Sequence, residues 1–460
     1  MDHIDRWNIL KPDQVAVVLP DRTVTYRELA TLVSRGSGAL AGFGVKPGDR
    51  VAVSVHNDLA SLVALWAVPR MGATVVAVNP RLDHRQTTVQ LDLVDPALVL
   101  GSDMLTGRTT HATESLFDGR PSMPHPHAPD DLHSVFFTSG STAEPKGVRL
   151  TWGNHEASAT ASATVQPVGP DDSWLAVLPL FHLGGFAITY RMFRAGGSVV
   201  LEPSYDAVRA AELMDTVSYA SVVPTMLTTL LAARPTPFAG PSKAVLIGGG
   251  PVSDELVANA WDAGLPVVAT YGLTETGSQV AAVPPADPGA GAVLLEGVAI
   301  EAGTAESPSA VRISGPMVSA GYWGEPDRAE WLETRDLGYL DENGHLHIIG
   351  RSDDVIISGG ENIHPAEVEA ALDALAMVTA SAVFGVADEL WGERVEAAVV
   401  LSDPTVTPEE LATAAKESLA DFKIPKGWHV VDELPLGPTG KVDKQALIDR
   451  AASEPGAEKT

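Results

Sequence analysis

The sequence predicts an α/β protein with a large N-terminal domain built on two α/β sheets and a smaller α+β C-terminal domain. Through roughly the first 350 residues, short β-branched runs alternate with longer helical patterns, which is typical of parallel sheets covered by helices. These strands are too many for one comfortable sheet, so we expect two. After residue 354 the pattern changes to a compact mixture of helices and strands of about 100 residues, a common domain size.

The first predicted elements are a strand at Val15–Leu19 and a helix at Thr25–Leu40. Thr25 is the expected N-cap, and Glu28, three residues later, completes a capping box. The string Gly36–Ala41 nominally fits a dinucleotide fingerprint, but it follows a helical pattern instead of a strand, which is the wrong context. Further strands are predicted at Val51–Val55, Val75–Val78, Leu98–Leu100, Val135–Phe137, Val199–Leu201, Ala220–Val223, Ala244–Ile247 and Val267–Thr270.

Two later segments differ from this alternation. Residues Ala281–Arg312 contain short runs with many Gly and Pro residues, which predicts a small β-rich subdomain. A strand at His345–Ile349 precedes a boundary near Arg351–Asp354, so we divide the chain into domains 1–350 and 351–460. The second domain has predicted elements at Pro365–Leu372 (helix), Ser381–Val386 and Val395–Leu401 (strands) and Pro408–Leu419 (helix).

Composition excludes several classes of function. The 460 residues include 31 Lys and Arg against 59 Asp and Glu, a formal charge of −28, and no cysteine. Without cysteine there can be no disulfide, thiolate metal site, Fe–S cluster or thiol nucleophile, and the acidic balance argues against a nucleic-acid partner. The chain lacks an uninterrupted apolar run long enough for a membrane span, and its first residues lack the apolar region of a signal peptide. We therefore expect a cytoplasmic protein.

The most informative local string is Thr138–Gly147, TSGSTAEPKG, which follows a predicted strand. Backbone amides, hydroxyls and a lysine on a tight turn can hold phosphates. The string is not a Walker A loop, because Pro145 precedes Lys146 and Gly147 follows it. Two histidine pairs with metal-like spacing, His125/His127 and His345/His347, lack a nearby third ligand in the sequence, so we interpret them as solvated or structural.

Three more strings carry polar groups next to predicted strands or turns. Tyr271–Thr276, YGLTET, offers a ring for stacking, a hydroxyl donor and a carboxylate for a hard cation. Asp336 is expected at a loop, where its carboxylate could accept hydrogen bonds from ribose hydroxyls. The segment Gly350–Glu369 contains the string SGGENIHP, and Lys441 lies in the turn PTGKVDK. Each string alone could equally be a turn or a solvated face.

Together and in this order, the strings resemble the adenylate-forming superfamily of acyl- and aryl-CoA ligases, luciferases and peptide-synthetase adenylation domains, over essentially the whole chain. The resemblance implies an N-terminal domain of two α/β sheets plus a small β-barrel, and a mobile C-terminal domain that carries the catalytic lysine. It implies ATP, Mg²⁺ and coenzyme A, with an acyl-AMP step followed by thioester formation. One departure is Ala143, where the phosphate loop usually has glycine.

The resemblance also implies residue roles. Gly248–Gly250 would let adenine approach the backbone, and Tyr271 would cover the adenine ring. Thr274 would bind the α-phosphate, and Glu275 would reach Mg²⁺. Lys441 would bridge the α-phosphate and the reacting carboxylate. The residues implied for the β- and γ-phosphates are Thr138, Ser139, Ser141, Thr142 and Lys146. Those implied for adenine and ribose are Gly248, Gly249, Gly250, Tyr271, Asp336 and Arg351. The implied hinge is Asp353, and the implied CoA contact is Trp391.

The pocket strings Pro179–Arg191, Ser221–Leu231 and Tyr271–Val280 look most like the o-succinylbenzoate–CoA ligases of menaquinone biosynthesis. Phe181 and His182 would line the channel to the reacting carboxyl group. Arg191, nine residues after the histidine, would pair with the second carboxylate of the substrate, because a buried carboxylate needs a partner.

Alternative functions remain open at this point. A benzoate-type or medium-chain acyl-CoA ligase, a carrier-loading adenylation protein, and more remotely a non-enzymatic nucleotide sensor would share most of these strings. The expected partners are a small-molecule carboxylate, ATP and CoA, with a homodimer open as an alternative to a monomer.

Overall fold

The computed structural model describes residues 2–101, 108–139, 145–250, 252–283, 291–352, 354–358, 361–388, 391–437 and 441–453. The chain divides into two compact units. Unit 1 comprises residues 1–252, 256–300 and 313–332, and unit 2 comprises residues 253–255, 301–312 and 333–460. The domain division expected after residue 350 concerns a hinge, and it stays a prediction.

The larger sheet of unit 1 has nine strands in the order β15-β14-β13-β12-β11-β9-β10-β1-β2. Neighbours from β1 to β13 along this order pair in parallel, whereas β2, β14 and β15 pair antiparallel at the two edges. The strands are β1 (Val15–Val18), β2 (Thr23–Thr25), β9 (Ser173–Ala176), β10 (Ser198–Leu201), β11 (Tyr219–Val222), β12 (Ala244–Ile247), β13 (Val267–Leu273), β14 (Ser278–Ala282) and β15 (Val293–Leu294).

The second sheet of unit 1 has six strands in the order β6-β5-β3-β4-β7-β8. All its pairs are parallel except the edge hairpin β7–β8. The strands are β3 (Arg50–Ser54), β4 (Thr74–Val78), β5 (Leu98–Leu100), β6 (Thr110–His111), β7 (Leu132–Ser139) and β8 (Pro145–Thr151). The two-sheet prediction for the large domain is therefore confirmed.

Helices cover and separate the two sheets. All twelve residues of α3 are buried, because this helix packs on α2, β3 and β4 and its Trp66 ring contacts α6, which packs on β9 and β10. Trp66 of α3 stacks on Tyr190 of α6 with ring centroids 5.6 Å apart. The helices of unit 1 are α1 (His3–Leu10), α2 (Tyr26–Gly42), α3 (Leu59–Arg70), α4 (His84–Val94), η1 (Thr113–Asp118), α5 (Trp152–Val165), α6 (Leu183–Ala195), α7 (Ala207–Leu213), α8 (Pro224–Ala233), α9 (Asp254–Asp262, whose first two residues are assigned to unit 2) and η2 (Thr274–Thr276).

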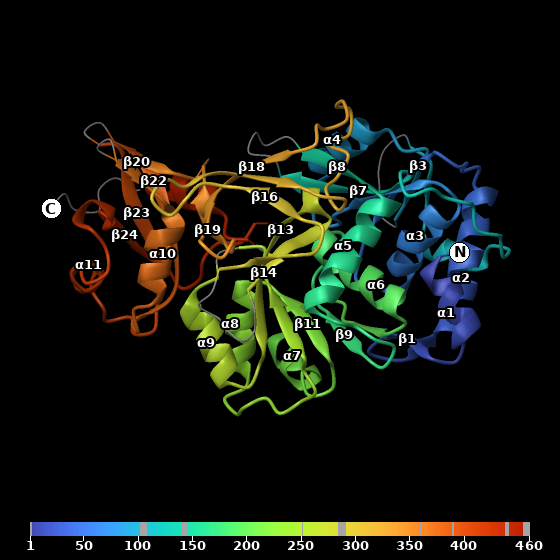
Figure 1. Cartoon of the computed structure of the whole chain (residues 1–460), viewed down its shortest axis with the longest axis horizontal. Coiled ribbons are helices and arrows are strands. Elements are labelled where there is room, and N and C mark those ends of the chain that lie inside the picture. The colour runs from blue at the N-terminus through green and yellow to red at the C-terminus, as the bar shows by residue number, and fades with distance from the viewer. Residues whose placement is uncertain are drawn as a thin grey trace. The chain divides into compact units, whose positions relative to one another are not determined.

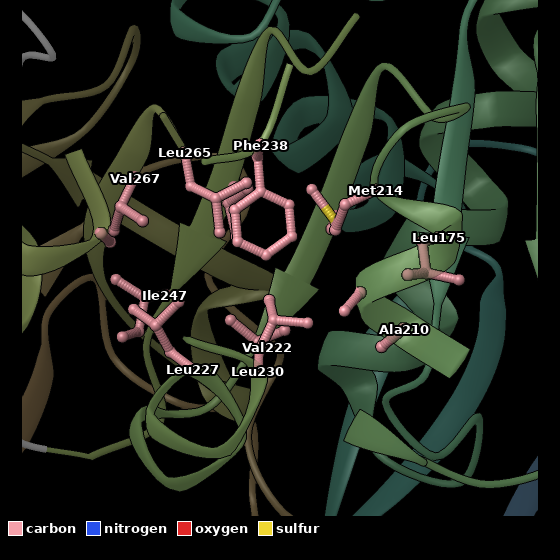
Figure 2. Packing of buried hydrophobic residues seen from close by; sticks show 14 of the residues in the cluster. Leu175, Ala210, Met214, Val222, Leu227, Leu230, Phe238, Ile247, Leu265 and Val267 are labelled. Atoms are coloured by element: carbon pink, nitrogen blue, oxygen red, sulfur yellow. The ribbon is translucent and has the colours of Figure 1, made fainter. Parts of the chain in front are cut away.

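Helices α7, α8 and α9 lie together on one side of the nine-stranded sheet (Figure 1) and bury an apolar core against it. Figure 2 shows the Phe238 ring among Leu265, Met214 and Val222 of this core. Phe238 is only 6% exposed, and burying such a side chain stabilises the fold by about 1.5–3 kcal/mol. The core packs against β12 and β13, which are parallel neighbours, so the residues that follow these strands lie together at their carboxyl ends.

Unit 2 is built on a five-stranded sheet in the order β21-β20-β23-β22, with β24 beside β23. Its strands are β20 (Ile356–Ser358), β21 (Glu361–Ile363), β22 (Val378–Asp388), β23 (Gly392–Leu401) and β24 (Gly427–Val430), and its helices are α10 (Pro365–Asp373), α11 (Pro408–Ala415), η3 (Asp421–Lys423) and α12 (Lys444–Ser453). The β-rich region predicted near residues 281–312 contributes to a separate four-stranded sheet in the order β16 (Ala299–Glu301), β17 (Ser309–Ser314), β18 (Leu332–Leu340) and β19 (Leu346–Arg351).

Local signals predicted most elements correctly, with two corrections. The capping box is present: the Thr25 side chain caps the Glu28 amide, and Glu28 reaches back to Thr25. Helix α11, however, ends at Ala415, not Leu419, since residues 416–418 form turns and residue 419 a bend. Asp336 lies inside strand β18, not in a loop. Among the described residues, no helix has the length and apolar character needed to cross a membrane.

Candidate active site

The described ends of the string Thr138–Gly147 lie in strands β7 and β8, at the edge of the six-stranded sheet. Strands β7 and β8 pair antiparallel, with Thr138 opposite Lys146. Residues 140–144, which include Ser141 and Thr142, lie outside the described residues, and of Ser139 only the backbone is described. The pairing of β7 with β8 thus places Thr138 and Lys146 side by side.

Lys146 and Glu275, 129 positions apart in the sequence, are connected by Tyr322, a residue that the sequence analysis missed. The Lys146 ammonium lies 4.8 Å from the centroid of the Tyr322 ring, and the Tyr322 hydroxyl donates a 2.9 Å hydrogen bond to Glu275 Oε1. Tyr322 is held there by a β-bridge to Val148 in strand β8. The only available sequence signal was the aromatic pair that Tyr322 forms with Trp323, directly after Gly321.

The adenine candidates follow neighbouring parallel strands. Gly248 comes directly after β12, and Tyr271 lies in β13, which pairs with β12 in parallel. A Cβ at Gly248 would lie 2.8 Å from Thr270 Oγ1 and 3.0 Å from the Thr270 carbonyl oxygen, so any larger residue here would force Thr270 to shift. Gly249 has a φ of +82°, a conformation that glycine adopts without steric cost. The structure therefore brings Gly248–Gly250 and Tyr271 together near the carboxyl ends of β12 and β13.

Thr274 and Glu275 lie on the single turn η2, between β13 and β14. Thr276 anchors this turn from below: its fully buried hydroxyl bonds the Leu273 and Ser278 carbonyl oxygens at 3.0 and 2.7 Å. Gly277 ends the turn in the left-handed region, with φ +65°. The turn is therefore held by short-range bonds, which fix the backbone from which both candidate side chains extend.

His182 is the N-cap residue of α6, and Phe181 precedes it. The two rings are neighbours, with centroids 4.4 Å apart, and Phe181 is buried. Arg191 lies further along the same helix. Its Nη2 donates a 3.0 Å hydrogen bond to Ser278 Oγ, which connects α6 to the segment directly after the Thr274–Glu275 turn.

Arg191 is a buried cation without an ion pair among the described residues, and it is only 6% exposed. Burial lowers the pKa of its guanidinium to about 10. Its guanidinium carbon lies 5.7 Å from the Trp174 ring centroid. Its hydrogen-bond partner Ser278 has a φ of +130°, and such strained backbone concentrates at functional sites. Arg191 therefore does not form an ion pair on the helix surface, which was the other expectation for an arginine at this position.

The ribose candidates lie together in unit 2. Asp336 in β18 and Arg351 in β19 are directly paired residues of a hairpin, and Arg351 Nη1 lies 3.6 Å from Asp336 Oδ1. The Asp336 side chain is buried, whereas Arg351 is largely exposed. Their association is observed, and their role towards ribose stays a prediction.

Two further candidates of unit 2, Trp391 and Lys441, lie between its helices and strands. Trp391 lies between β22 and β23, is 39% exposed, and has the Lys426 ammonium 4.4 Å from its ring centroid. Lys441 is an exposed residue just before α12. Asp353 lies outside the described residues, so its hinge role stays a prediction.

The histidine pairs have other neighbours. His127 stacks on Trp152 with ring centroids 3.8 Å apart, and His345 and His347 lie 3.5 and 3.3 Å from Asp341 Oδ2. Within the part of the chain that the structure describes, no group of three or more His, Asp or Glu side chains is arranged to hold a metal ion. A single carboxylate such as Glu275 nevertheless fits Mg²⁺, because Mg²⁺ commonly takes one or two carboxylates and completes its shell with substrate phosphates and water.

Comparisons with known protein families, sequences and structures identify similar proteins over nearly the whole chain. Residues 4–323 match the family described as AMP-binding enzyme, and residues 367–441 match its C-terminal domain. The 2-succinylbenzoate–CoA ligase of Bacillus cereus (strain Q1) is 33% identical, over 95% of this chain and 96% of the relative. A solved o-succinylbenzoate CoA synthetase of Bacillus subtilis, in complex with the acyl-adenylate intermediate OSB-AMP, has a TM-score of 0.90 at 30% identity and covers 99% of both chains. The same enzyme with ATP and magnesium ion has a TM-score of 0.87 at 30% identity, over 96% of this chain and 98% of that one.

Proposed function

Because this chain belongs to the AMP-binding enzyme family, we propose that it is an AMP-forming acid–thiol ligase acting on o-succinylbenzoate. The acid would attack the α-phosphate of ATP, which gives acyl-AMP and releases pyrophosphate, and the CoA thiol would then displace AMP to give o-succinylbenzoyl-CoA. The relatives named above support this assignment, since they are ligases of this name and are similar to this protein over nearly its whole chain. The product would be an intermediate of menaquinone biosynthesis.

The observation that favours a dicarboxylic substrate is the buried Arg191. A guanidinium that is buried without an ion pair among the described residues costs free energy in the free protein. It also offers a charged donor to a ligand. The substrate o-succinylbenzoate has two carboxylates, one that reacts and one that does not. We assign the non-reacting carboxylate to Arg191, which would offset the cost of burying both charges.

The adenylation step needs charge stabilisation more than proton transfer. A carboxylate is already ionised at pH 7 and can attack the α-phosphate without a general base. Lys146 and Thr138 would bind the β- and γ-phosphates, Thr274 the α-phosphate, and Lys441 the charge that builds between the α-phosphate and the attacking carboxylate. Mg²⁺ bound with ATP would neutralise part of the phosphate charge, and Glu275 would hold it.

The direct test is a panel of carboxylic acids assayed for ATP- and CoA-dependent pyrophosphate release. We expect o-succinylbenzoate to be preferred over 4-phenylbutyrate and benzoate, which lack the second carboxylate. Equal or better turnover of a monocarboxylate would replace this proposal with a general aryl- or acyl-CoA ligase. Activity with a phosphopantetheinylated carrier protein but not with free CoA would favour a carrier-loading protein.

The proposal extends to location and assembly. ATP and CoA are both available in the cytoplasm, so we place the enzyme there, and we include a homodimer as an assembly to be tested. Cell fractionation checks the location. Light scattering coupled to size-exclusion chromatography checks the mass against the 48.1 kDa of one chain.

A further inference from the structure

Lys441 lies on one arm of a small hairpin in unit 2, which pairs residues 435–437 with residues 441–443. The Gly437 amide donates a 2.8 Å hydrogen bond to the Lys441 carbonyl oxygen, and the Asp443 amide donates one of 2.8 Å to the Pro435 carbonyl oxygen. Between them, Leu436 and Val442 form an antiparallel bridge. These contacts shape the hairpin locally but do not by themselves attach it to the rest of unit 2.

An ion pair directly after the hairpin makes that attachment. Lys444, the first residue of α12, places its ammonium 2.8 Å from Glu369 Oε1 on helix α10. The Glu369 side chain is 11% exposed, and its Oε1 also accepts a 2.8 Å hydrogen bond from the Val383 amide in strand β22. One carboxylate therefore joins α10, β22 and the start of α12, three residues after Lys441.

Apolar packing provides a second attachment, which the ion pair complements. Leu447 is 4% exposed and packs in a cluster with Ala382, Phe384 and Ala398, against which Val442 also packs. Apolar contacts are non-directional, so they tolerate small shifts of α12 along the sheet. The charge-assisted contact of Lys444 has a defined donor and acceptor, and it restricts where the helix can begin.

We propose that the Lys444–Glu369 ion pair is a positioning device for Lys441. This inference rests on the proposed role of Lys441 in adenylation. A reacting group must be placed accurately, and a misplacement of about 1 Å can cost on the order of 100-fold in rate. The pair fixes the backbone position from which the Lys441 side chain extends, without touching the reacting atoms itself.

The test compares three variants with a matched control. Lys444→Met and Glu369→Gln remove the ion pair, and Lys444→Arg retains a cation that can reach the same carboxylate. The control is Lys423→Met, which breaks a different ion pair on the same helix α10, between Lys423 and Glu367 at 2.5 Å. Each full-length variant is assayed for pyrophosphate release, for thioester formation from preformed acyl-adenylate, and for its melting temperature.

We expect Lys444→Met and Glu369→Gln to lower kcat for pyrophosphate release about 10- to 100-fold, with little change in KM for ATP. Thioester formation from preformed acyl-adenylate should stay near the wild-type rate, Lys444→Arg should recover most of the adenylation rate, and Lys423→Met should retain both activities. A kcat within twofold of wild type in Lys444→Met, or an equal loss in both half-reactions, would overturn the inference. If Lys444→Met does not fold, Glu369→Gln decides by the same criteria.

Lys441→Ala, measured alongside, separates this inference from the proposed function. If Lys441→Ala keeps wild-type adenylation, the assigned role of the lysine is wrong, and the positioning inference fails with it. If Lys441→Ala loses adenylation while Lys444→Met and Glu369→Gln keep it, only the positioning inference fails.

Discussion

Replacing Arg191 by leucine tests the substrate assignment most directly. The variant removes the charge, the Nη2 hydrogen bond to Ser278 Oγ and the proposed partner of the second carboxylate. A hydrogen bond to a charged group contributes about 1.5–3 kcal/mol, which corresponds to about 10- to 100-fold in kcat/KM. We expect a loss of this size towards o-succinylbenzoate. The loss towards 4-phenylbutyrate should be much smaller, because this acid has no second carboxylate to bind Arg191.

The stability of this variant should not fall with its activity. Burial lowers the pKa of Arg191 from 12.5 to about 10, so the folded state disfavours the charged form. At pH 7 the arginine is protonated in both the folded and the unfolded state. At about 1.4 kcal/mol per pKa unit, its buried charge therefore costs the folded protein roughly 3 kcal/mol. Leucine escapes this cost but loses the bond to Ser278, so we expect an unchanged or raised melting temperature.

The assay is pyrophosphate release with each acid at saturating ATP and CoA, together with thermal unfolding. Arg194→Leu is the matched control, because Arg194 lies on the same helix but is paired at 2.7 Å with Glu156. It should keep the acid preference of the wild type. If Arg191→Leu loses equally on both acids, or if its activity falls only in proportion to a lowered melting temperature, the reasoning is refuted.

Four further predictions concern other parts of the chain. Lys441→Ala should lower pyrophosphate release ~10²–10³-fold while preformed acyl-adenylate restores much of thioester formation; surviving pyrophosphate release would disprove the assignment. Asp353→Pro should lock φ and impair the thioester half-reaction much more than adenylation, and equal losses would count against a hinge. Trp391→Ala should raise KM for CoA but not for ATP, and unaltered CoA saturation would reject the contact. Burial lowers the pKa of His155 from 6.5 to about 3, so this residue binds fewer protons in the folded protein than in the unfolded chain. Its contribution to stability is therefore fully present above pH 6.5 and is lost as the pH falls from 6.5 towards 3. Urea unfolding between pH 6 and pH 4 should show this residue's slope of about 1.4 kcal/mol per pH unit, and a slope unchanged in His155→Gln would contradict it.

The predictions that succeeded from the sequence depend on neighbours along the chain. The capping box of Thr25 and Glu28 needs only two residues three positions apart, and the structure contains it. The string Gly36–Ala41 lies inside helix α2, as its helical context indicated. The expectation for Asp336 failed because the strand–turn boundary depends on pairing with β19, where a register shift follows Leu337.

The order of the motifs, the alternation of strands and helices and the chemistry of each loop were determined by the sequence alone, since they depend on residue type and short spacing. Only the tertiary structure decided which distant groups meet. Tyr322 joins Lys146 and Glu275, and Arg191 is buried against Ser278, 87 positions away. The physical reason is that burial and long-range contacts arise from packing helices onto sheets. A polar residue on a helix has the same local pattern whether its face meets solvent or a second sheet, and here α6 places Arg191 in the interior.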